Sequence, residues 1–382
     1  MKKILVLEDN VWGHHLEYMS HLFHNIPNGS ECELIYVVPH TFDEVRSLMV
    51  DQENVHVTID YMTDEDYHQY HKGNYLTASW NKCKILRKYA LKHKVNECFL
   101  IMLVYYLPLL PFFIPRGCKV SGILYRIYYY SWKELNIFRK IKDILEFLVL
   151  AKSQHIRKAY LLNAATAAVY SNKIFHTSKF AYLPDPINLP KVSVQNMREV
   201  LDIPLNQCIY LHFGALTERK GTLTILKAIQ KFSDEEIKKY TYIFAGRVYN
   251  DIKSEFYRLK EELVRRGANI IVYDEFCTYE HLANLINIAN VILVPYSNVS
   301  SSSGIIGYAS KFNIPVIGPS NGLLGKLIRK YKLGKTLHQI TPDTLYKELK
   351  KGSFENNSNP KYVEINTIKN FSRTIFNDII SH

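Results

Sequence analysis

The sequence predicts an α/β protein made of two similar domains, each with a doubly wound parallel sheet. Apolar runs of strand length alternate with amphipathic stretches of helix length, which is typical of successive βαβ units. The alternation stops at Pro184-Asp185-Pro186, which we interpret as a linker between domains. A chain of 382 residues also exceeds the usual size of one core. We expect domains at 1–186 and 187–352, and a tail at 353–382 whose helix packs back on the first domain.

The first half begins with a buried strand at 3–7. The chain becomes acidic and polar directly after this strand, so the apolar run is too short for a signal peptide. Residues 99–115 are apolar enough to resemble a membrane span, but Pro108, Pro111 and Pro115 would interrupt such a helix. We therefore expect a buried strand and then a short helix there. The elements expected in this half are strands at 3–7, 34–38, 99–104, 119–124, 167–170 and 180–183, and helices at 14–24, 79–93 and 132–164.

The second half repeats the alternation. Phe256, Leu259 and Leu263 lie on one face of a predicted helix that ends at Gly267, a residue typical of the position after a helix. Thr278 is suited to cap the next helix. The elements expected here are strands at 209–213, 242–245, 270–272, 291–294 and 316–317, helices at 222–232 and 254–266, helices from 278 and from 305, and a last amphipathic helix that carries Ile368, Phe371, Ile375 and Ile379.

Charge and cysteine usage limit the class of partner. The net charge is +12, from 48 Lys and Arg against 36 Asp and Glu, and it favours nucleotide phosphates, acidic membranes or nucleic acid. No nucleic-acid partner is expected, because the βαβ order contains no RNP-like or helix-turn-helix pattern. The six cysteines are scattered without a CxxC pair, which argues against a zinc site and a disulfide framework and favours a cytoplasmic protein.

Two loops of small residues follow predicted strands of the second half, at 300–304 and 318–322. Ligands of α/β sheets bind at the carboxyl ends of strands. A helix that starts there directs backbone N–H groups and its positive dipole end at an anion. We therefore expect a phosphorylated ligand across both loops, and ordinary strand–helix turns without a ligand are the alternative. The residues expected to contact it in the first loop are Ser301, Ser302, Ser303, Gly304 and Ile305.

Five segments in chain order resemble the retaining glycosyltransferases of family four. They are FGALTERKG at 213–221, FAGR at 244–247, DEF at 274–276, and the segments 289–295 and 313–318. Each segment is short, but all five occur in the order found in the family. The resemblance is best over 205–335. It implies a GT-B fold, in which two Rossmann-like domains face each other across a cleft. It also implies transfer of a sugar from a nucleotide-diphosphate sugar with retention of configuration.

The resemblance places the donor in the second domain. Lys220 matches the lysine of the family's diphosphate loop, and Arg219 supplies a second cation where Ala215 replaces the usual arginine. Cations at this point stabilise the negative charge that develops on the departing diphosphate. We expect no metal and no other cofactor, since such enzymes generally dispense with a metal. A solvated cation pair on a loop is the alternative. Further donor contacts are expected at Gly214, Glu275 and Phe276. Arg247, at the carboxyl end of a predicted strand, is expected to reach the phosphate or the base, and an exposed side chain without a ligand is the alternative.

One feature of the family is missing. Members usually carry two glutamates eight positions apart, and the matching positions here hold Ser300 and Tyr308. Serine hydroxyls can bind sugar hydroxyls, although such neutral hydrogen bonds are weaker than bonds to a carboxylate. The alternative to an enzyme is therefore a catalytically silent GT-B module that binds a partner transferase or a glycan.

The first domain is expected to bind the acceptor. Gly13 matches the glycine-rich turn of the family, and His14 or His15 is placed to bind the acceptor or a phosphate. Arg126 is the nearest polar candidate where many members have a histidine. From 133 to 158, basic residues alternate with Leu, Ile and Phe, which is typical of a helix on an anionic bilayer, although an ordinary basic face also fits. We expect a glycan or polyprenyl-linked acceptor, cell-surface polysaccharide synthesis, and peripheral contact with the inner face of the cytoplasmic membrane.

Overall fold

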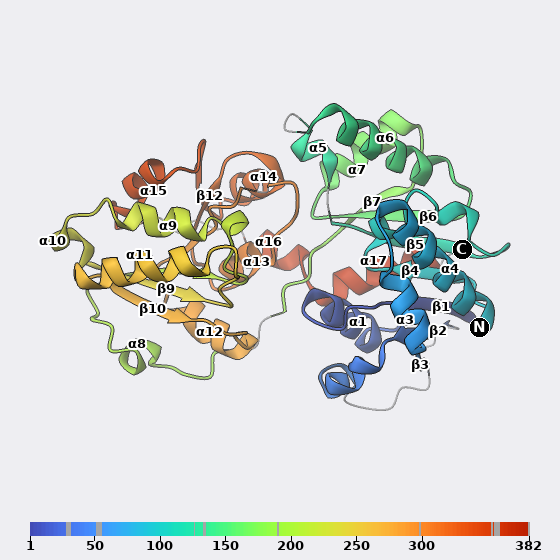
Figure 1. Cartoon of the computed structure of the whole chain (residues 1–382), viewed down its shortest axis with the longest axis horizontal. Coiled ribbons are helices and arrows are strands. Elements are labelled where there is room, and N and C mark those ends of the chain that lie inside the picture. Colours follow the sequence, from blue (N-terminus) through green and yellow to red (C-terminus); the bar gives the residue numbers. More distant parts are fainter. Residues whose placement is uncertain are drawn as a thin grey trace. The chain divides into compact units, whose positions relative to one another are not determined.

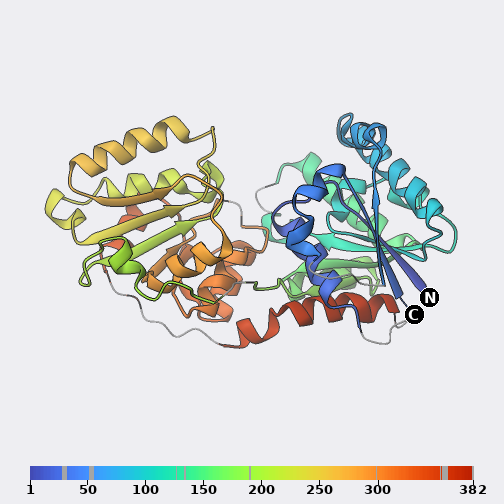
Figure 2. The same cartoon turned by 90° about the horizontal axis from the view of Figure 1, so that it is seen from below.

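A computed structural model describes residues 1–27, 32–50, 56–125, 127–132, 135–188, 191–297, 299–352, 354 and 360–380. The chain forms two compact units (Figures 1 and 2). Unit 1 comprises Met1–Asp185 and the chain from Ile368 onward, and unit 2 comprises Pro186–Thr367. The segment expected as one tail therefore contributes to both units.

Unit 1 is built on a seven-stranded parallel sheet of order β3-β2-β1-β4-β5-β6-β7. The order reverses between β1 and β4, so the carboxyl ends of these two strands form a topological switch point. The strands are β1 (Lys2–Leu7), β2 (Cys32–Val38), β3 (Val57–Tyr61), β4 (Glu97–Leu100), β5 (Lys119–Leu124), β6 (Ile156–Leu162) and β7 (Phe180–Leu183).

Helices cover both faces of this sheet (Figures 1 and 2). The α-helices are α1 (His14–His24), α2 (Arg46–Met49), α3 (Asp64–His71), α4 (Tyr75–Lys92), α5 (Tyr128–Ser131), α6 (Ile137–Lys152), α7 (Ala165–Phe175) and α17 (Ile368–Ile380). The 3₁₀ helices are η1 (His40–Glu44), η2 (Leu103–Tyr106) and η3 (Leu110–Phe112). The last helix, α17, packs on α1: Ser372 donates to the carbonyl of His21 at 2.9 Å, and the Phe371 ring lies 4.8 Å from that of Tyr18.

Three predicted elements of unit 1 differ from the structure. The single helix expected at 132–164 is wrong, because α6 ends before Ser153 and the buried strand β6 begins at Ile156. The strand expected at 167–170 is also wrong, since these residues lie within α7, where the high helix propensity of alanine prevails. The strand expected at 99–104 ends at Leu100, and 3₁₀ helices follow it. Among the described residues, no helix is long and apolar enough to span a membrane.

Unit 2 is built on a six-stranded parallel sheet of order β10-β9-β8-β11-β12-β13, which reverses between β8 and β11. The strands are β8 (Cys208–Phe213), β9 (Tyr240–Ala245), β10 (Asn269–Tyr273), β11 (Val291–Leu293), β12 (Val316–Pro319) and β13 (Gly334–Leu337). The helices are α8 (Met197–Val200), η4 (Glu218–Lys220), α9 (Thr222–Ile229), α10 (Asp234–Ile237), α11 (Lys253–Arg265), α12 (Tyr279–Ile288), α13 (Gly304–Lys311), α14 (Gly322–Lys330), α15 (Pro342–Leu349) and α16 (Lys361–Ile365).

Local signals account for most of the boundaries in unit 2. The Thr278 hydroxyl caps α12 as expected, by accepting from the backbone N–H of His281 at 3.2 Å. Phe256, Leu259 and Leu263 of α11 are buried in the core. β13 was not predicted, because this edge strand is largely exposed and offers little apolar pattern.

Candidate functional site

The switch point of unit 2 brings together two loops that are far apart in the sequence. The loop at 214–221 follows β8, and the loop at 294–303 follows β11, which pairs with β8. Two hydrogen bonds join the loops, since the backbone N–H and the hydroxyl of Ser297 each donate to the carbonyl of Arg219 at 3.1 Å. Gly221 has φ of 73°, and a Cβ there would lie 2.2 Å from the carbonyl oxygen of Pro295. The cationic loop is therefore fixed against the chain that enters α13.

Lys220 is held at this junction by its side chain and its backbone. Its Nζ lies 3.9 Å from the centroid of the Tyr296 ring, which is a cation–π contact. Its backbone N–H donates to the hydroxyl of Thr217 at 3.3 Å. Arg219, the neighbouring cation, is exposed. The two side chains thus supply one ordered and one solvated positive charge.

The buried imidazole of His212 lies beneath this loop. Its Nδ1 is 2.9 Å from the carbonyl oxygen of Leu293, and its Nε2 is 3.0 Å from the Thr222 hydroxyl. Burial lowers the pKa of His212, the hydrogen bond to the Leu293 carbonyl opposes this effect, and the charge of Lys220 adds to it, so that the pKa is about 4. His212 is therefore neutral near pH 7, and it ties β8 to β11 and to the start of α9.

The first turn of α13 faces the same end of the sheet. Gly214 has φ of 93°, and a Cβ there would lie 3.6 Å from Cδ1 of Ile305. Within the described chain, the side chain of Ser303 makes no capping hydrogen bond at the N-terminus of α13. The first backbone N–H groups of such a helix suit an anion. Ser301, Ser302, Ser303 and Gly304 are half-buried, and Ile305 is buried.

A pocket of about 410 Å³ adjoins the cationic loop. Arg247 follows β9 and is one of the lining residues, and its side chain is exposed. The Arg247 carbonyl accepts from the Leu216 N–H at 3.0 Å. Gly246 makes this approach possible: its φ is 140°, and a Cβ there would lie 1.9 Å from the carbonyl oxygen of Gly214. The pocket is lined by Thr217, Arg247, Val248, Tyr249, Asn250 and Asp251. The structure therefore places Arg247 beside the loop of Arg219 and Lys220.

Other predicted positions lie further out or inside the core. Glu275 and Phe276 are exposed between β10 and α12, two strands from β8 in the sheet, and the Phe276 side chain is 78% exposed. Ser300 is buried, and the ring of Tyr308 stacks on that of Phe213 with centroids 6.2 Å apart. The two positions where the family carries glutamates thus hold a buried serine and a packed tyrosine.

In unit 1, the predicted histidines lie at the carboxyl end of β1. Gly13, with φ of 58°, precedes α1. His14 Nδ1 lies 2.8 Å from Glu17 Oε2, and His15 Nδ1 lies 3.0 Å from an oxygen of the buried Glu8. Burial raises the pKa of Glu8, an effect that His15 opposes. Arg126 lies outside the described residues.

The structure adds polar residues that were missed at the switch point of unit 1. Asp9 Oδ2 lies 2.9 Å from Nε2 of His71, at the end of α3. Lys82 of α4 has its Nζ 3.4 Å from the centroid of the Tyr70 ring, and burial lowers its pKa. Glu8 and Asp9 directly follow β1, so the acidic pair after the first strand was an available signal. Among the described residues, no group of three His, Cys, Asp or Glu side chains is arranged to hold a metal.

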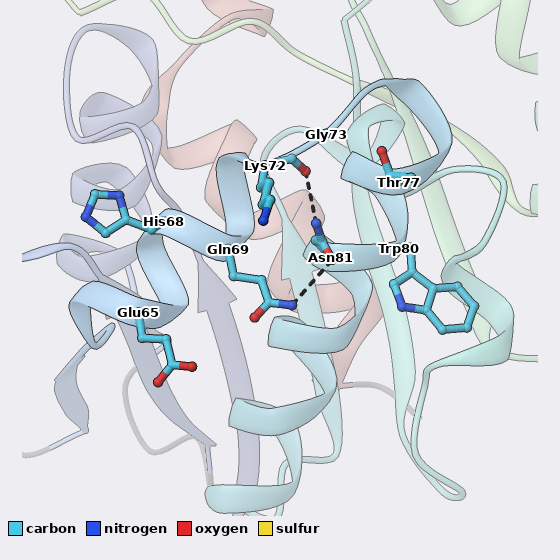
Figure 3. A pocket seen from close by; sticks show the side chains of 8 residues that line it. All are labelled: Glu65, His68, Gln69, Lys72, Gly73, Thr77, Trp80 and Asn81. Carbon is cyan, nitrogen blue, oxygen red and sulfur yellow. Dashed lines mark hydrogen bonds between the residues drawn. The ribbon is translucent and has the colours of Figure 1, made fainter.

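A second hollow, of about 600 Å³, lies between α3 and α4 (Figure 3). The Trp80 indole is 53% exposed and packs edge-on against Phe113, with ring centroids 4.8 Å apart. The Asn81 amide donates to the Lys72 carbonyl at 2.9 Å, and Gln69 donates to Asn81 at 3.5 Å. An exposed indole beside side-chain amides offers both a stacking surface and hydrogen bonds to a polar ring. The lining residues are Glu65, His68, Gln69, Lys72, Gly73, Thr77, Trp80 and Asn81.

Comparisons with known proteins identify the fold. No protein-family description and no curated protein matches the sequence. One similar solved structure is WaaG, a glycosyltransferase involved in lipopolysaccharide biosynthesis, with a TM-score of 0.66 and 13% sequence identity over 99% of each chain. A second is Anabaena HepE in complex with UDP and glucose, with a TM-score of 0.69 and 12% identity over 100% of each chain. A third is S. aureus MnaA with UDP, with a TM-score of 0.65 and 13% identity over 99% of this chain and 96% of MnaA. The predicted GT-B fold, with two Rossmann-like units, is confirmed.

Proposed function

We propose that the protein is a glycosyltransferase that moves a sugar from a nucleotide-diphosphate sugar to a glycan or lipid-linked acceptor in polysaccharide assembly. The observation that carries this proposal is the pair of hydrogen bonds from Ser297 to the carbonyl of Arg219. They join the cationic loop to the chain that enters α13, at the switch point where α/β sheets bind ligands. Two cations and a helix N-terminus therefore serve one anionic ligand.

The proposed chemistry uses this positive charge at the moment when the sugar leaves. As the glycosidic bond to the donor breaks, negative charge gathers on the departing diphosphate. Lys220, Arg219 and the first N–H groups of α13 are assigned to stabilise that charge, because preorganised donors act most strongly where charge develops. The proposal includes no metal, since protein groups carry the neutralisation. Retention of configuration is proposed from the resemblance to family four.

The similar structures suggest which donors to test first. HepE is described with UDP, with UDP and glucose, and with UDP-glucose, and MnaA is described with UDP. We assign Arg247 to the phosphates or the base, and Phe276 and Glu275 to the outer part of the donor. We assign Gly13, His14 and His15 of unit 1 to the acceptor. The proposed setting is the cytoplasmic side of the membrane.

A second candidate function is a silent module that binds a partner transferase or a glycan. Ser300 and Tyr308 favour it, because neither side chain can supply the carboxylate that the family places there. The buried Tyr308 is packed on Phe213 and offers an aromatic face in place of a charge. In this reading the donor site persists without turnover.

A ligand screen separates these readings. The thermal unfolding of the full chain is measured with UDP, GDP, ADP and CMP and with their sugar conjugates. A ligand at a hundred times its Kd stabilises the folded protein by about 2.7 kcal/mol. One nucleoside diphosphate should shift the melting temperature, and Lys220→Ala should abolish the shift. A shift without sugar transfer supports the silent module, whereas no shift with any nucleotide overturns the donor site.

A further inference from the structure

Helix α6 of unit 1 buries Phe147, Leu150 and Ala151 together with both of its acidic residues, and it exposes a second apolar group. A surface helix normally buries its apolar stripe and exposes its charges. In α6, the two acidic residues, Asp143 and Glu146, are each only 6% exposed, and Glu146 accepts a hydrogen bond from the Tyr75 hydroxyl. Six large apolar side chains are instead between 39% and 80% exposed: Ile137, Phe138, Ile141, Ile144, Leu145 and Leu148.

These six side chains, here called the α6 apolar face, form one continuous stripe. Successive helical residues are rotated by about 100°, which places all six within an arc of about 120°. The same rotation per residue places Lys140 about 40° beyond one edge of the stripe and Lys142 about 40° beyond the other. Lys140 Nζ is 5.4 Å from the Trp132 ring centroid, and Lys142 Nζ is 3.7 Å from that of Tyr75. Cations thus flank the stripe on both sides.

The neighbouring helix α7 also exposes apolar side chains. α7 packs against α6, and the two helices lie side by side in Figure 1. It exposes Val169, Tyr170 and Ile174, of which Val169 is 70% exposed. Nine exposed apolar side chains on two packed helices are more than the scattered apolar residues of an ordinary protein surface.

We propose that the α6 apolar face lies on an anionic lipid bilayer, with its axis in the plane of the interface. The apolar stripe would enter the boundary between headgroups and acyl chains, and the flanking lysines would reach the anionic headgroups. This attachment goes beyond sugar transfer, because it sets where the enzyme works and does not depend on the donor site. It brings a lipid-linked acceptor and unit 1 to the same surface.

The charges favour a bilayer over a second copy of the chain. A two-fold pairing through the α6 apolar face would bring the same positively charged edges towards each other. Glu146 Oε1 lies 3.7 Å from Lys142 Nζ and offsets part of that charge within each copy. Both acidic residues of α6 are nevertheless buried and lie outside the stripe, so they offer no carboxylate to the lysines of a second copy. An anionic membrane surface attracts the lysines at both edges of the stripe. Each lysine should strengthen binding to that surface about fivefold.

The test is flotation of the full-length protein with phosphatidylcholine vesicles, with and without phosphatidylglycerol. The wild type should float with the anionic vesicles and bind the neutral ones far less. The pair Phe138→Ser and Leu145→Ser should weaken binding by about tenfold per side chain. Lys140→Gln with Lys142→Gln should weaken it about fivefold per lysine on anionic vesicles only. Leu205→Ser, at an apolar side chain of unit 2 that is 88% exposed, is the matched control and should bind as the wild type does.

Melting curves and gel filtration decide the remaining outcomes. The replaced side chains are exposed, so every variant should melt close to the wild type, and binding losses then report the surface itself. The proposal is overturned if the wild type stays unbound to anionic vesicles, or if the Phe138 and Leu145 pair binds as the control does. It is also overturned if the wild type is a dimer that this pair converts to a monomer, because a second copy would then cover the α6 apolar face.

Discussion

Replacing Lys220 by alanine tests the donor site most directly. The Nζ–Tyr296 contact fixes the ammonium, while the loop itself is held by Ser297 and Arg219, so the variant should lose the charge and keep the loop. A hydrogen bond between an ammonium and a phosphate contributes about 1.5–3 kcal/mol. Its loss should raise the Kd for a nucleoside diphosphate about 10- to 150-fold. The lost cation–π contact should lower the free energy of unfolding by only about 0.5–1 kcal/mol.

The assay is calorimetric titration of UDP and of uridine into the wild type, Lys220→Ala and Lys227→Ala. Lys227 is an exposed lysine on α9 and serves as the matched control for the loss of one positive charge. Uridine carries no phosphate, so its Kd should be the same in all three proteins. The reasoning is refuted if Lys220→Ala leaves UDP binding unchanged, or if it weakens UDP and uridine by the same factor.

Three further predictions follow from local geometry. For His212, the pKa of the folded state is about 4 against 6.5 for the free side chain, so the unfolded chain binds the proton more tightly. Stability should be complete above pH 6.5 and fall by roughly 3 kcal/mol as the pH drops to 4, and His212→Gln should flatten this slope in urea titrations at each pH. Gly246→Ala forces a Cβ towards the Gly214 carbonyl at a positive φ and should cost more than about 2 kcal/mol in urea unfolding. Gly352→Ala, where the Cβ meets only the Tyr240 ring at 3.5 Å, should cost less, and equal losses would contradict the close approach. Phe276→Ala should weaken the binding of UDP and of uridine equally, because each loses about 1–3 kcal/mol of base stacking. Unchanged affinities would show that Phe276 does not contact the base.

The βαβ architecture could be predicted because its signals are local. Strand-length apolar runs at β8, β9 and β11 are buried on both faces of a parallel sheet, so they remain apolar throughout. The same reasoning failed where local signals compete. The alanine-rich start of α7 was taken for a strand, and β6 was merged into a helix because only Ser153 and its neighbours separate two apolar segments.

The candidate site was predictable in part. The loop of Arg219 and Lys220 could be located from the sequence, because parallel strands place the loops at their carboxyl ends at one edge of the sheet. The partners of these cations could not, since Tyr296 and Ser297 come from a loop 76 or more residues later in the chain. The pairing of Asp9 with His71 was missed for the same reason.

Local patterns were enough to predict the two-unit α/β class, the positions of most strands, and the loops that carry the cations, because hydrophobic period and turn residues act over a few neighbouring positions. Contacts between distant parts of the chain establish which loops are joined, which histidine is kept neutral by burial, and which face of α6 is exposed. The basic and apolar pattern of α6 was visible in the sequence, but a helix can bury either side. Packing on unit 1 buried the side that carries Phe147 and Leu150 with Asp143 and Glu146, and it left the α6 apolar face exposed to solvent.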